Sequence, residues 1–361
     1  MNRDARIYIA GHNGLVGSAL VRKLQAEGYA NLITRAHGDL DLTRQAKVEA
    51  FFEDERPEYV FLAAAKVGGI WANQTWPAEF IYKNLAIQTN VIHAAWKTEV
   101  QGLLFLGSSC IYPRECPQPM KEEYLLTGSL EVTNEPYAVA KIAGVKMCQF
   151  YNRQYGTNFM SVMPTNLYGP DDNFDLETSH ALPALIRKCH LAKLAAEGNW
   201  EAVKKNESRC GRIPDGVRTA LDLRPQASNC KPHGPRVILW GSGNPRREFL
   251  HVDDLAGACL FLIENFSASD LEARDLPDSM VNIGCGKDMT IKELALMIKE
   301  IVGFEGDMLF DTTKPDGTPQ KLLDISTMES LGWSPRISLR DGIRQTYEWY
   351  LENIHPRYNA P

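Results

Sequence analysis

The feature that most constrains the fold is a regular alternation, in the first half of the chain, of short apolar runs with longer segments of helical periodicity. Residues 6–11, 31–35, 59–65, 103–109 and 159–164 have the lengths and β-branched or aromatic residues of strands. Residues 14–28, 77–97 and 135–156 have the apolar spacing of helices. Strands that are apolar throughout are typical of a parallel sheet covered on both faces. The sequence therefore predicts an α/β fold with a doubly wound parallel sheet.

Polar and glycine residues follow several of the predicted strands. Gly11 follows the first, Ser108–Cys110 the fourth and Pro164–Asn166 the fifth. In an open α/β sheet, ligands bind beyond the carboxyl ends of the strands. We therefore expect these residues to share one cleft.

The pattern becomes less regular after residue 170. We predict a main domain of residues 1–170 with parts of 246–284. A smaller C-terminal α/β lobe of residues 171–245 and 285–361 is expected to bind the substrate.

A polar segment, rich in glycine and proline, follows a predicted helix at 181–197. Residues 198–236 contain eight lysines and arginines against four acidic residues. Such a basic loop could help to hold a phosphorylated ligand, but we favour a solvated surface excursion. The segment is expected to be an insertion.

Composition excludes several classes of protein. The net charge of −6 over 361 residues gives no reason to expect nucleic acid or an anionic membrane as a partner. No apolar run is long enough to cross a bilayer, and the first residues do not resemble a signal peptide. The eight cysteines show neither C-x-x-C pairs nor zinc-site spacing. We expect a cytoplasmic protein with reduced thiols and no metal.

A glycine-rich turn joins the first predicted strand to the first predicted helix. Its glycines are Gly11, Gly14 and Gly17 in "GHNGLVG". Glycine at such positions permits a tight turn, a close approach of the backbone to a pyrophosphate, and close packing of helix on strand. The pattern alone is weak, but its position favours a dinucleotide-binding site.

The end of the second predicted strand bears on which dinucleotide binds. An acid about 20 residues after the glycines selects NAD, and a base there accommodates the 2′-phosphate of NADP. Arg35 stands at that position, with His37 as a weaker second contact, and the first acids are Asp39 and Asp41. This favours NADP, although Arg35 could also be a solvated charge at the strand end.

Tyr137 and Lys141 lie four residues apart in "PYAVAK", on one face of a predicted helix. A phenol has a pKa of about 10, so it works as an acid–base group near neutrality only when its anion is stabilised. A neighbouring ammonium can do this and can also bind ribose hydroxyls. Ser108 would then hydrogen-bond a substrate carbonyl, to which Tyr137 would give a proton and a nicotinamide a hydride.

Together, the glycine turn, the strand-end serine and Tyr-x-x-x-Lys resemble the extended short-chain dehydrogenase/reductase family. Longer motifs resemble, within it, the GDP-4-keto-6-deoxymannose 3,5-epimerase/4-reductases. They are "AAAKVGGI", "LFLGSSCIYP", "TNEPYAVAKIAG", "SVMPTNLYGP", "WGSGNPRREFLHVDD" and "KPDGTPQKLLD". The resemblance spans nearly the whole chain except 198–236. It implies a Rossmann-type fold, NADP(H), a homodimer, and conversion of GDP-4-keto-6-deoxy-D-mannose to GDP-L-fucose.

The resemblance also implies a role for each catalytic side chain. A 4-keto group acidifies the C–H bonds at C3 and C5, and inverting these centres needs a base, an acid and donors for the enolate oxygen. Cys110 would be the base and His180 the acid, while Ser108 and Tyr137 would hold the oxygen. Without the resemblance, Cys110 would be interpreted as a small buried side chain and His180 as a helix-entry residue.

Further contacts follow from matching motifs. The cofactor would contact Gly11, His12, Asn13, Gly14, Leu15, Val16, Gly17, Arg35, His37, Asp41, Leu42, Leu106, Gly107, Ser108, Ser109, Tyr137, Lys141, Pro164, Thr165, Asn166, Leu167 and His180. The GDP-sugar would contact Lys188, Trp240, Arg247 and Asp316, although Trp240 could belong to the core and Arg247 could pair with Glu248. The family often has arginines at the positions of Asn13 and His37, which favour NADP, and an arginine can occur where Lys188 stands.

Two alternatives remain open. The first is another nucleotide-sugar enzyme of this fold, either a 4,6-dehydratase or a 4-epimerase. Dehydratases of this type typically have Asp-Glu after the strand-end hydroxyl, whereas this chain has Ser109 and Cys110. A catalytically silent dinucleotide sensor is the other, and the intact Ser108, Tyr137 and Lys141 argue against it.

Overall fold

The computed structural model of the chain describes residues 1–221, 223, 234–274, 276, 279–314 and 316–353. The chain forms two compact units. Unit 1 comprises Met1–Leu167, Glu248–Lys287 and Leu322–Ile337, and unit 2 comprises Tyr168–Arg247, Asp288–Lys321 and Ser338–Pro361. We expected the whole of 285–361 in the smaller lobe. Residues 285–287 and 322–337 lie in unit 1 instead. There Met120 N donates to Leu322 O at 2.7 Å and Asp324 N donates to Met120 O at 2.8 Å.

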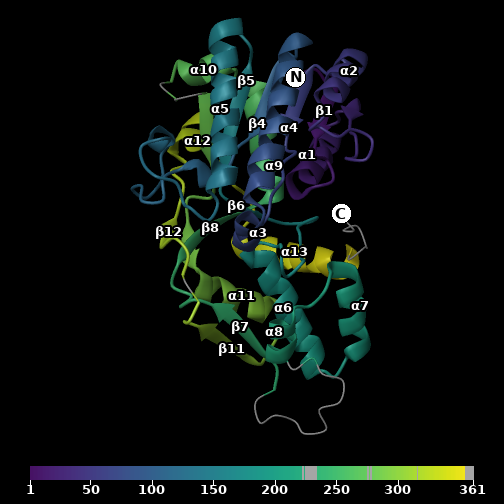
Figure 1. Cartoon of the computed structure of the whole chain (residues 1–361), viewed down its shortest axis with the longest axis vertical. Coiled ribbons are helices and arrows are strands. Elements are labelled where there is room, and N and C mark those ends of the chain that lie inside the picture. Colours follow the sequence, from purple (N-terminus) through teal and green to yellow (C-terminus); the bar gives the residue numbers. More distant parts are fainter. Residues whose placement is uncertain (222, 224–233, 275, 277–278, 315, 354–361) are drawn as a thin grey trace. The chain divides into compact units, whose positions relative to one another are not determined.

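Unit 1 is built on a six-stranded sheet in which every neighbouring pair is parallel (Figure 1). Its strand order is β2-β1-β3-β4-β5-β9. The strands are β1 (Ile7–Ala10), β2 (Leu32–Ile33), β3 (Tyr59–Leu62), β4 (Gly102–Leu106), β5 (Phe159–Pro164) and β9 (Met280–Ile283). The doubly wound parallel sheet is thus confirmed. Its order reverses between β1 and β3, which is where ligands bind in such folds.

Helices cover both faces of this sheet, as expected from strands that are apolar on both sides. Ile7 and Ile9 face one core with α1 (Leu15–Ala26) and α9 (Val252–Asn265). Tyr8 and Ala10 face the other, with α2 (Gln45–Glu55), α4 (Pro77–Lys97) and α5 (Glu135–Tyr155). Helices α4 and α5 run side by side (Figure 1). The shorter elements are α3 (Ile70–Thr75), η1 (Ser109–Ile111), η2 (Glu122–Tyr124), α10 (Ala268–Glu272) and α12 (Ser326–Leu331).

Unit 2 contains helices and short strands. Strands β7 (Arg236–Trp240) and β11 (Asp307–Asp311) form a parallel pair. Strands β10 (Asp288–Thr290) and β12 (Gln320–Lys321) also belong to unit 2, whereas β6 (Asn166–Tyr168) and β8 (Arg246–His251) have residues in both units. The helices are α6 (Ala181–Ala196), α7 (Trp200–Cys210), α8 (Asp215–Ala220), α11 (Ile291–Val302) and α13 (Leu339–Asn353).

Helices α7 and α8 fall in the segment 198–236, so the expectation of a solvated loop there is wrong for much of it. Val203, Ile213, Leu221 and Leu223 are buried. Two of its cations are paired within the segment, because Arg218 contacts Glu207 and Arg212 contacts Asp215 at 3.1 Å. Arg224 and Lys231, which we counted among the cations of this segment, lie outside the described residues. That the segment is an insertion stays a prediction.

The described residues contain neither a helix fit to span a membrane nor a group of side chains fit to hold a metal ion. No helix among them combines the length and apolarity needed to cross a membrane. No group of three or more His, Cys, Asp or Glu side chains in this part of the chain is arranged to hold a metal ion. The described cysteines are all free thiols.

Candidate active site

The turn between β1 and α1 has a shape that only glycine permits. Gly11 has a φ of +89°, and a Cβ there would lie 2.7 Å from the backbone nitrogen of Ala64, just after β3. A Cβ on Gly17 would lie 2.0 Å from the Gly11 carbonyl oxygen. Gly14 N donates to this same oxygen at 3.1 Å and closes the turn. The predicted roles of the first and third glycines, a tight turn and close packing of helix on turn, thus match their surroundings.

The start of α1 is suited to binding an anion. Gly14 is its N-cap, and in the described structure no side chain caps the helix and no acid stands in its first turn. The first N–H groups of a helix need acceptors, and phosphate oxygens fit them. The neighbouring His12 has a buried Nδ1 without a hydrogen-bond partner among the described residues. Leu15 and Val16 are half-buried and Asn13 is exposed. These features fit a pyrophosphate.

The segment after β2 carries the residues predicted to distinguish NADP from NAD. Arg35 and His37 are exposed. The Arg35 guanidinium donates to Glu55 of α2 and to Thr34 O. Asp41 accepts hydrogen bonds from the hydroxyl and N–H of Thr43 at 2.7 and 3.0 Å, which lower the pKa of its carboxyl. The adjacent Leu42 is buried.

The end of β4 brings together Ser108, Cys110, Tyr137 and Lys141. Ser108 is the N-cap of η1, and its Oγ accepts a hydrogen bond from Cys110 N at 3.3 Å. Burial raises the pKa of Tyr137, the Cys110 thiol raises it further, and a hydrogen bond with the Ser108 hydroxyl lowers it. The Ser108 hydroxyl and the Cys110 thiol thus both belong to the electrostatic surroundings of the phenol. This arrangement is consistent with the prediction that Ser108 and Tyr137 act on one carbonyl.

Lys141 lies one helical turn beyond Tyr137 and is buried. Its Nζ donates to Leu106 O at 2.6 Å and lies 4.8 Å from the Phe105 ring centroid and 5.7 Å from that of Tyr137. Burial lowers the pKa of its amine to about 7. The helix can approach β4 because residue 144 is glycine, since a Cβ on Gly144 would lie 2.4 Å from Phe105.

The backbone after β5 is fixed by a residue that the sequence did not single out. Thr165 Oγ1 and Asn166 Nδ2 donate to the carbonyl oxygen of Glu248 at 3.3 and 2.8 Å. The fully buried Glu248 carboxylate accepts N–H groups of Cys285 and Gly286 at 2.6 and 2.7 Å, and one of Leu323 at 3.0 Å. Pro164 ends β5, Leu167 packs against the core, and Gly107 and Ser109 are buried.

A second unpredicted residue fixes the loop after β3. Asn84 of α4 accepts from Lys66 N at 2.9 Å and donates to Lys66 O at 3.0 Å. It is buried, and no motif in the sequence marks it. The loop follows directly on Ala64, which contacts the glycine turn. Asn84 therefore supports the edge of the sheet at its switch point.

Three of the four predicted substrate contacts lie together in unit 2. Gly241 and Ser242 follow Trp240, and the Asp316 carboxylate accepts from Ser242 N at 2.8 Å and from its hydroxyl at 2.7 Å. A Cβ on Gly317 would lie 3.0 Å from an Arg247 nitrogen. Trp240 is 68 % exposed, so it is not a core residue. Its ring lies 5.5 Å from Lys314 Nζ.

The other predicted contacts in unit 2 belong to α6. His180 is its exposed N-cap and Lys188 is half-buried. The alternative pairing of Arg247 with Glu248 is not what is observed. Arg247 donates to Arg246 O and Thr318 O, both at 2.7 Å, and the Glu248 carboxylate binds backbone N–H groups.

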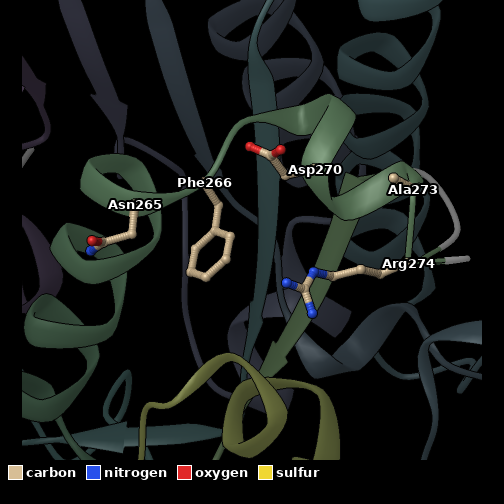
Figure 2. Close-up of a pocket in the computed structure, with 5 residues that line it drawn as sticks. All are labelled: Asn265, Phe266, Asp270, Ala273 and Arg274. Carbon is tan, nitrogen blue, oxygen red and sulfur yellow. The ribbon is translucent and has the colours of Figure 1, made fainter.

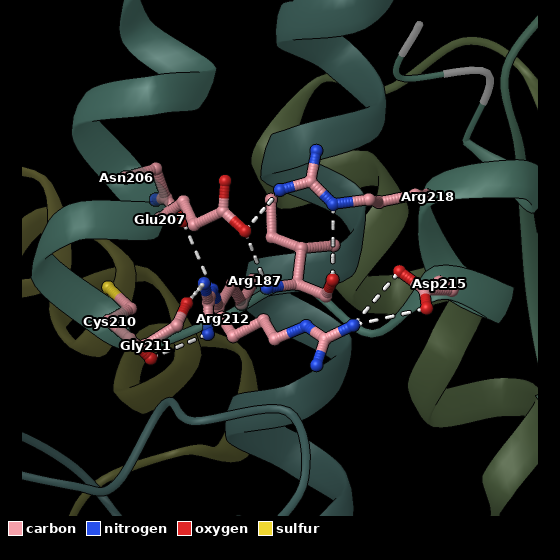
Figure 3. Close-up of polar contacts among 9 residues, drawn as sticks. Arg187, Asn206, Glu207, Cys210, Gly211, Arg212, Asp215 and Arg218 are labelled. Atoms are coloured by element: carbon pink, nitrogen blue, oxygen red, sulfur yellow. Dashed lines mark hydrogen bonds and ion pairs between the residues drawn. The ribbon is translucent and has the colours of Figure 1, made fainter.

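A fully buried arginine is next to Lys188. Arg187 is fully buried and binds four acceptors, of which Figure 3 shows those on Asn206, Cys210 and Gly211. It donates to Asn206 Oδ1 at 3.0 Å and to the carbonyl oxygens of Phe174, Cys210 and Gly211 at 3.1, 2.7 and 2.5 Å. It thereby fastens α7 to α6 and to the segment that leads to His180.

A surface pocket at the end of α9 is unrelated to these residues. Figure 2 shows it lined by Asn265, Phe266, Asp270, Ala273 and Arg274. The Arg274 guanidinium lies 5.8 Å from the Phe266 ring centroid. None of the predicted site residues lines this pocket, and we assign it no role.

Comparisons with known proteins agree with this geometry. The sequence model of the "NAD dependent epimerase/dehydratase family" matches residues 7–208 and 203–284. GDP-L-fucose synthase 1 of Arabidopsis thaliana is 54 % identical over 98 % of this chain and 95 % of its own. The GDP-L-fucose synthase of Escherichia coli is 49 % identical over 96 % of this chain and 97 % of its own. A GDP-mannoheptose C4 reductase from Campylobacter jejuni, solved with NADP bound, superposes with a TM-score of 0.82 at 42 % identity, over 97 and 99 % of the two chains. The chain therefore belongs to the NAD dependent epimerase/dehydratase family, and within it to the relatives of the GDP-L-fucose synthases.

Proposed function

We propose that this protein converts GDP-4-keto-6-deoxy-D-mannose to GDP-L-fucose, by epimerising C3 and C5 and then reducing C4 with NADPH. The observation that carries the proposal is the convergence of Ser108, Cys110, Tyr137 and Lys141 at the end of β4. A hydroxyl, a thiol, a phenol and an amine there can serve both proton transfer and carbonyl reduction. The synthases of Arabidopsis and E. coli support the choice of substrate.

The cofactor would be held by the glycine turn, by Lys141 and by the segment after β5. NADPH, when bound, supplies a hydride to C4. The close contacts of Gly11 and Gly17 leave no room for a Cβ, and the open start of α1 offers N–H groups to the pyrophosphate. The NADP bound in the C. jejuni reductase supports NADP as the cofactor here.

In the epimerisation, the Cys110 thiolate would remove the proton from C3 and C5. Each carbanion is stabilised because its charge spreads onto the C4 oxygen, where Ser108 and Tyr137 can donate hydrogen bonds. His180, the N-cap of α6, would return a proton from its imidazole to the opposite face of the sugar. These two roles rest on the family resemblance.

In the reduction, Tyr137 would give its phenolic proton to the C4 oxygen. Burial keeps this phenol protonated, because it raises the pKa. The Lys141 amine, 5.7 Å from the ring centroid, can stabilise the phenolate in its ammonium form. Ser108 would hold the same oxygen in both reactions, which explains why the two reactions can share one site.

One alternative is favoured by a specific observation. The C. jejuni relative is described as a C4 reductase, so a chain of this kind can be a reductase on a different GDP-sugar. A 4,6-dehydratase, a 4-epimerase or a silent sensor has less support, because the relatives with the highest identities quoted above are synthases. Solvent exchange at C3 and C5 separates the synthase from the pure reductase.

The test uses GDP-4-keto-6-deoxy-D-mannose in deuterated water, with and without NADPH. We expect deuterium at C3 and C5 by NMR without NADPH, and loss of NADPH absorbance with formation of GDP-L-fucose when it is added. Cys110→Ser should suppress the exchange and leave NADPH binding intact. Cys116→Ser, another half-buried thiol of unit 1, is the matched control. Reduction without exchange would contradict the synthase assignment.

We further propose a cytoplasmic homodimer. Tyr82 of α4 and Val139 and Phe150 of α5 are exposed, and apolar side chains on paired helices are typical of a subunit interface. Sedimentation should give twice the monomer mass, and Phe150→Glu should shift it towards monomer. The free thiols of the described cysteines fit a reducing compartment such as the cytoplasm. Cell fractionation should find the protein in the cytoplasmic fraction.

A further inference from the structure

The end of β2 places Arg35 beside the glycine turn. Strands β1 and β2 are parallel, and Tyr8 pairs with Ile33. Continuing this register by two residues sets Arg35 level with Ala10, immediately before Gly11. In dinucleotide-binding folds a residue at this point meets the 2′ position of the adenosine ribose. The backbone of Arg35 is therefore at the place where NADP and NAD differ.

The charge of Arg35 is already engaged by α2. Its guanidinium forms an ion pair with Glu55, at the end of α2, and lies 5.6 Å from the ring centroid of Phe51 on the same helix. A second nitrogen donates to Thr34 O at 2.8 Å. The side chains of Arg35 and Glu55 are 39 and 31 % exposed, so both remain accessible to a ligand.

We propose that Glu55 weakens the preference for NADP over NAD, by competing with the 2′-phosphate of NADP for the Arg35 guanidinium. The inference rests on the dinucleotide cofactor of the proposed function. A phosphate that binds Arg35 must either displace the Glu55 carboxylate or sit beside it, and both cost free energy because the two anions repel. NAD has a neutral hydroxyl at that position, so the carboxylate costs it nothing.

Neither Asn13 nor His37, the positions at which the family often has arginines, supplies a second guanidinium. Asn13 of the glycine turn is exposed and uncharged. His37 is exposed two residues after Arg35. The preference for NADP thus depends mainly on Arg35, and a carboxylate that holds Arg35 weakens that preference.

The test is a binding titration of the full chain without sugar. NADP⁺ and NAD⁺ are titrated by calorimetry against the parent and Glu55→Gln. We expect the NADP⁺ dissociation constant to fall about two- to fivefold and that of NAD⁺ to stay unchanged, as for a part-exposed ion pair. The matched control is Glu53→Gln, which removes an exposed carboxylate from the same helix and should leave the ratio of the two constants unchanged.

A double-mutant cycle locates the effect on Arg35. Arg35→Gln should weaken NADP⁺ binding, and adding Glu55→Gln to it should change nothing. An equal gain for both cofactors, or the same gain in Glu53→Gln, would show a long-range charge effect and overturn the inference. Weaker NADP⁺ binding in Glu55→Gln would overturn it too, because Glu55 would then be orienting Arg35.

The failure of the inference is distinguishable from that of the proposed function. If the parent binds NADP⁺ with a normal isotherm and Glu55→Gln leaves the ratio unchanged, only the inference falls. If the parent binds neither cofactor, the proposed function fails and the inference with it. Thermal unfolding of each variant confirms that it is folded.

Discussion

Replacing Lys141 with methionine should make the cofactor-free protein more stable at low pH. The side chain is 3 % exposed, and burial lowers the pKa of its amine from 10.5 to about 7. The unfolded chain keeps this proton up to about pH 10.5, whereas the folded protein loses it near pH 7. Because the unfolded state binds more protons between these values, the stability of the parent protein rises with pH across this window.

The size of the effect follows from the shift. Lowering the pKa from 10.5 to about 7 costs the folded protein about 5 kcal/mol of stability below pH 7. At about pH 9 only about 2 kcal/mol of this cost is left. Methionine fills the space of the lysine stem but leaves Leu106 O without its donor, which costs about 1–2 kcal/mol. We therefore expect Lys141→Met to be about 3 kcal/mol more stable than the parent at about pH 6, and no more stable at about pH 9.

The assay is thermal unfolding of both proteins over this pH range without cofactor. At about 2 °C per kcal/mol for a unit of this size, the midpoint of the variant should exceed that of the parent by about 6 °C at the acidic end. Lys146→Met, which removes a half-buried lysine from the same helix, is the matched control. Parallel curves for Lys141→Met and the parent would refute the reasoning. The variant should also lose reductase activity, because a buried charge that weakens the fold is retained for function.

The remaining predictions concern four other positions. Tyr137→Phe removes the proton donor, so the reduction rate should fall about 100-fold or more while NADP⁺ still binds in a titration. In Gly17→Ala the added Cβ meets the Gly11 carbonyl, so calorimetry should show NADP⁺ affinity about tenfold lower; unchanged affinity would contradict the packing. Glu248→Gln turns an acceptor of Leu323 N into a donor, and denaturation should show a loss of about 1.5–3 kcal/mol. Arg187→Lys should lose about 2–4 kcal/mol by the same measurement, and full stability would mean that its charge alone suffices.

The parts of the fold that the sequence predicted are those determined by local periodicity. Strands β1, β3, β4 and β5 alternate between two buried faces, so nearly all their residues are apolar and the run is conspicuous. Helices α1, α4 and α5 repeat apolar residues at helical spacing. Parallel strands bring their carboxyl ends to one edge, so the topology alone places Gly11, Ser108 and Pro164 at the same edge of the sheet.

Helices α7 and α8 were missed because the segment 198–236 lacks such a period. Helix α7 has few apolar residues, and its buried side chains are Val203 and Asn206. The amide of Asn206 replaces an apolar contact, because it accepts from Arg187 and donates to Tyr350 OH at 2.5 Å. A pattern of hydrophobic residues cannot reveal a helix that is packed through hydrogen bonds.

Arg187 and Glu248 are buried charges that the sequence analysis did not predict, and both for the same reason. Neither charge is matched by an opposite side chain in the contacts described above. Arg187 binds three backbone carbonyls and one amide oxygen, and Glu248 binds three backbone N–H groups. Backbone groups carry no sequence signature, so a search for ion pairs or conserved spacing cannot find these partners. Arg187 needs the planar, branched guanidinium group, because a lysine offers three donors from a single nitrogen and cannot reach four separated acceptors. Each charge therefore fixes chain segments distant in sequence, the turn before His180 in one case and the strand end at Thr165 in the other.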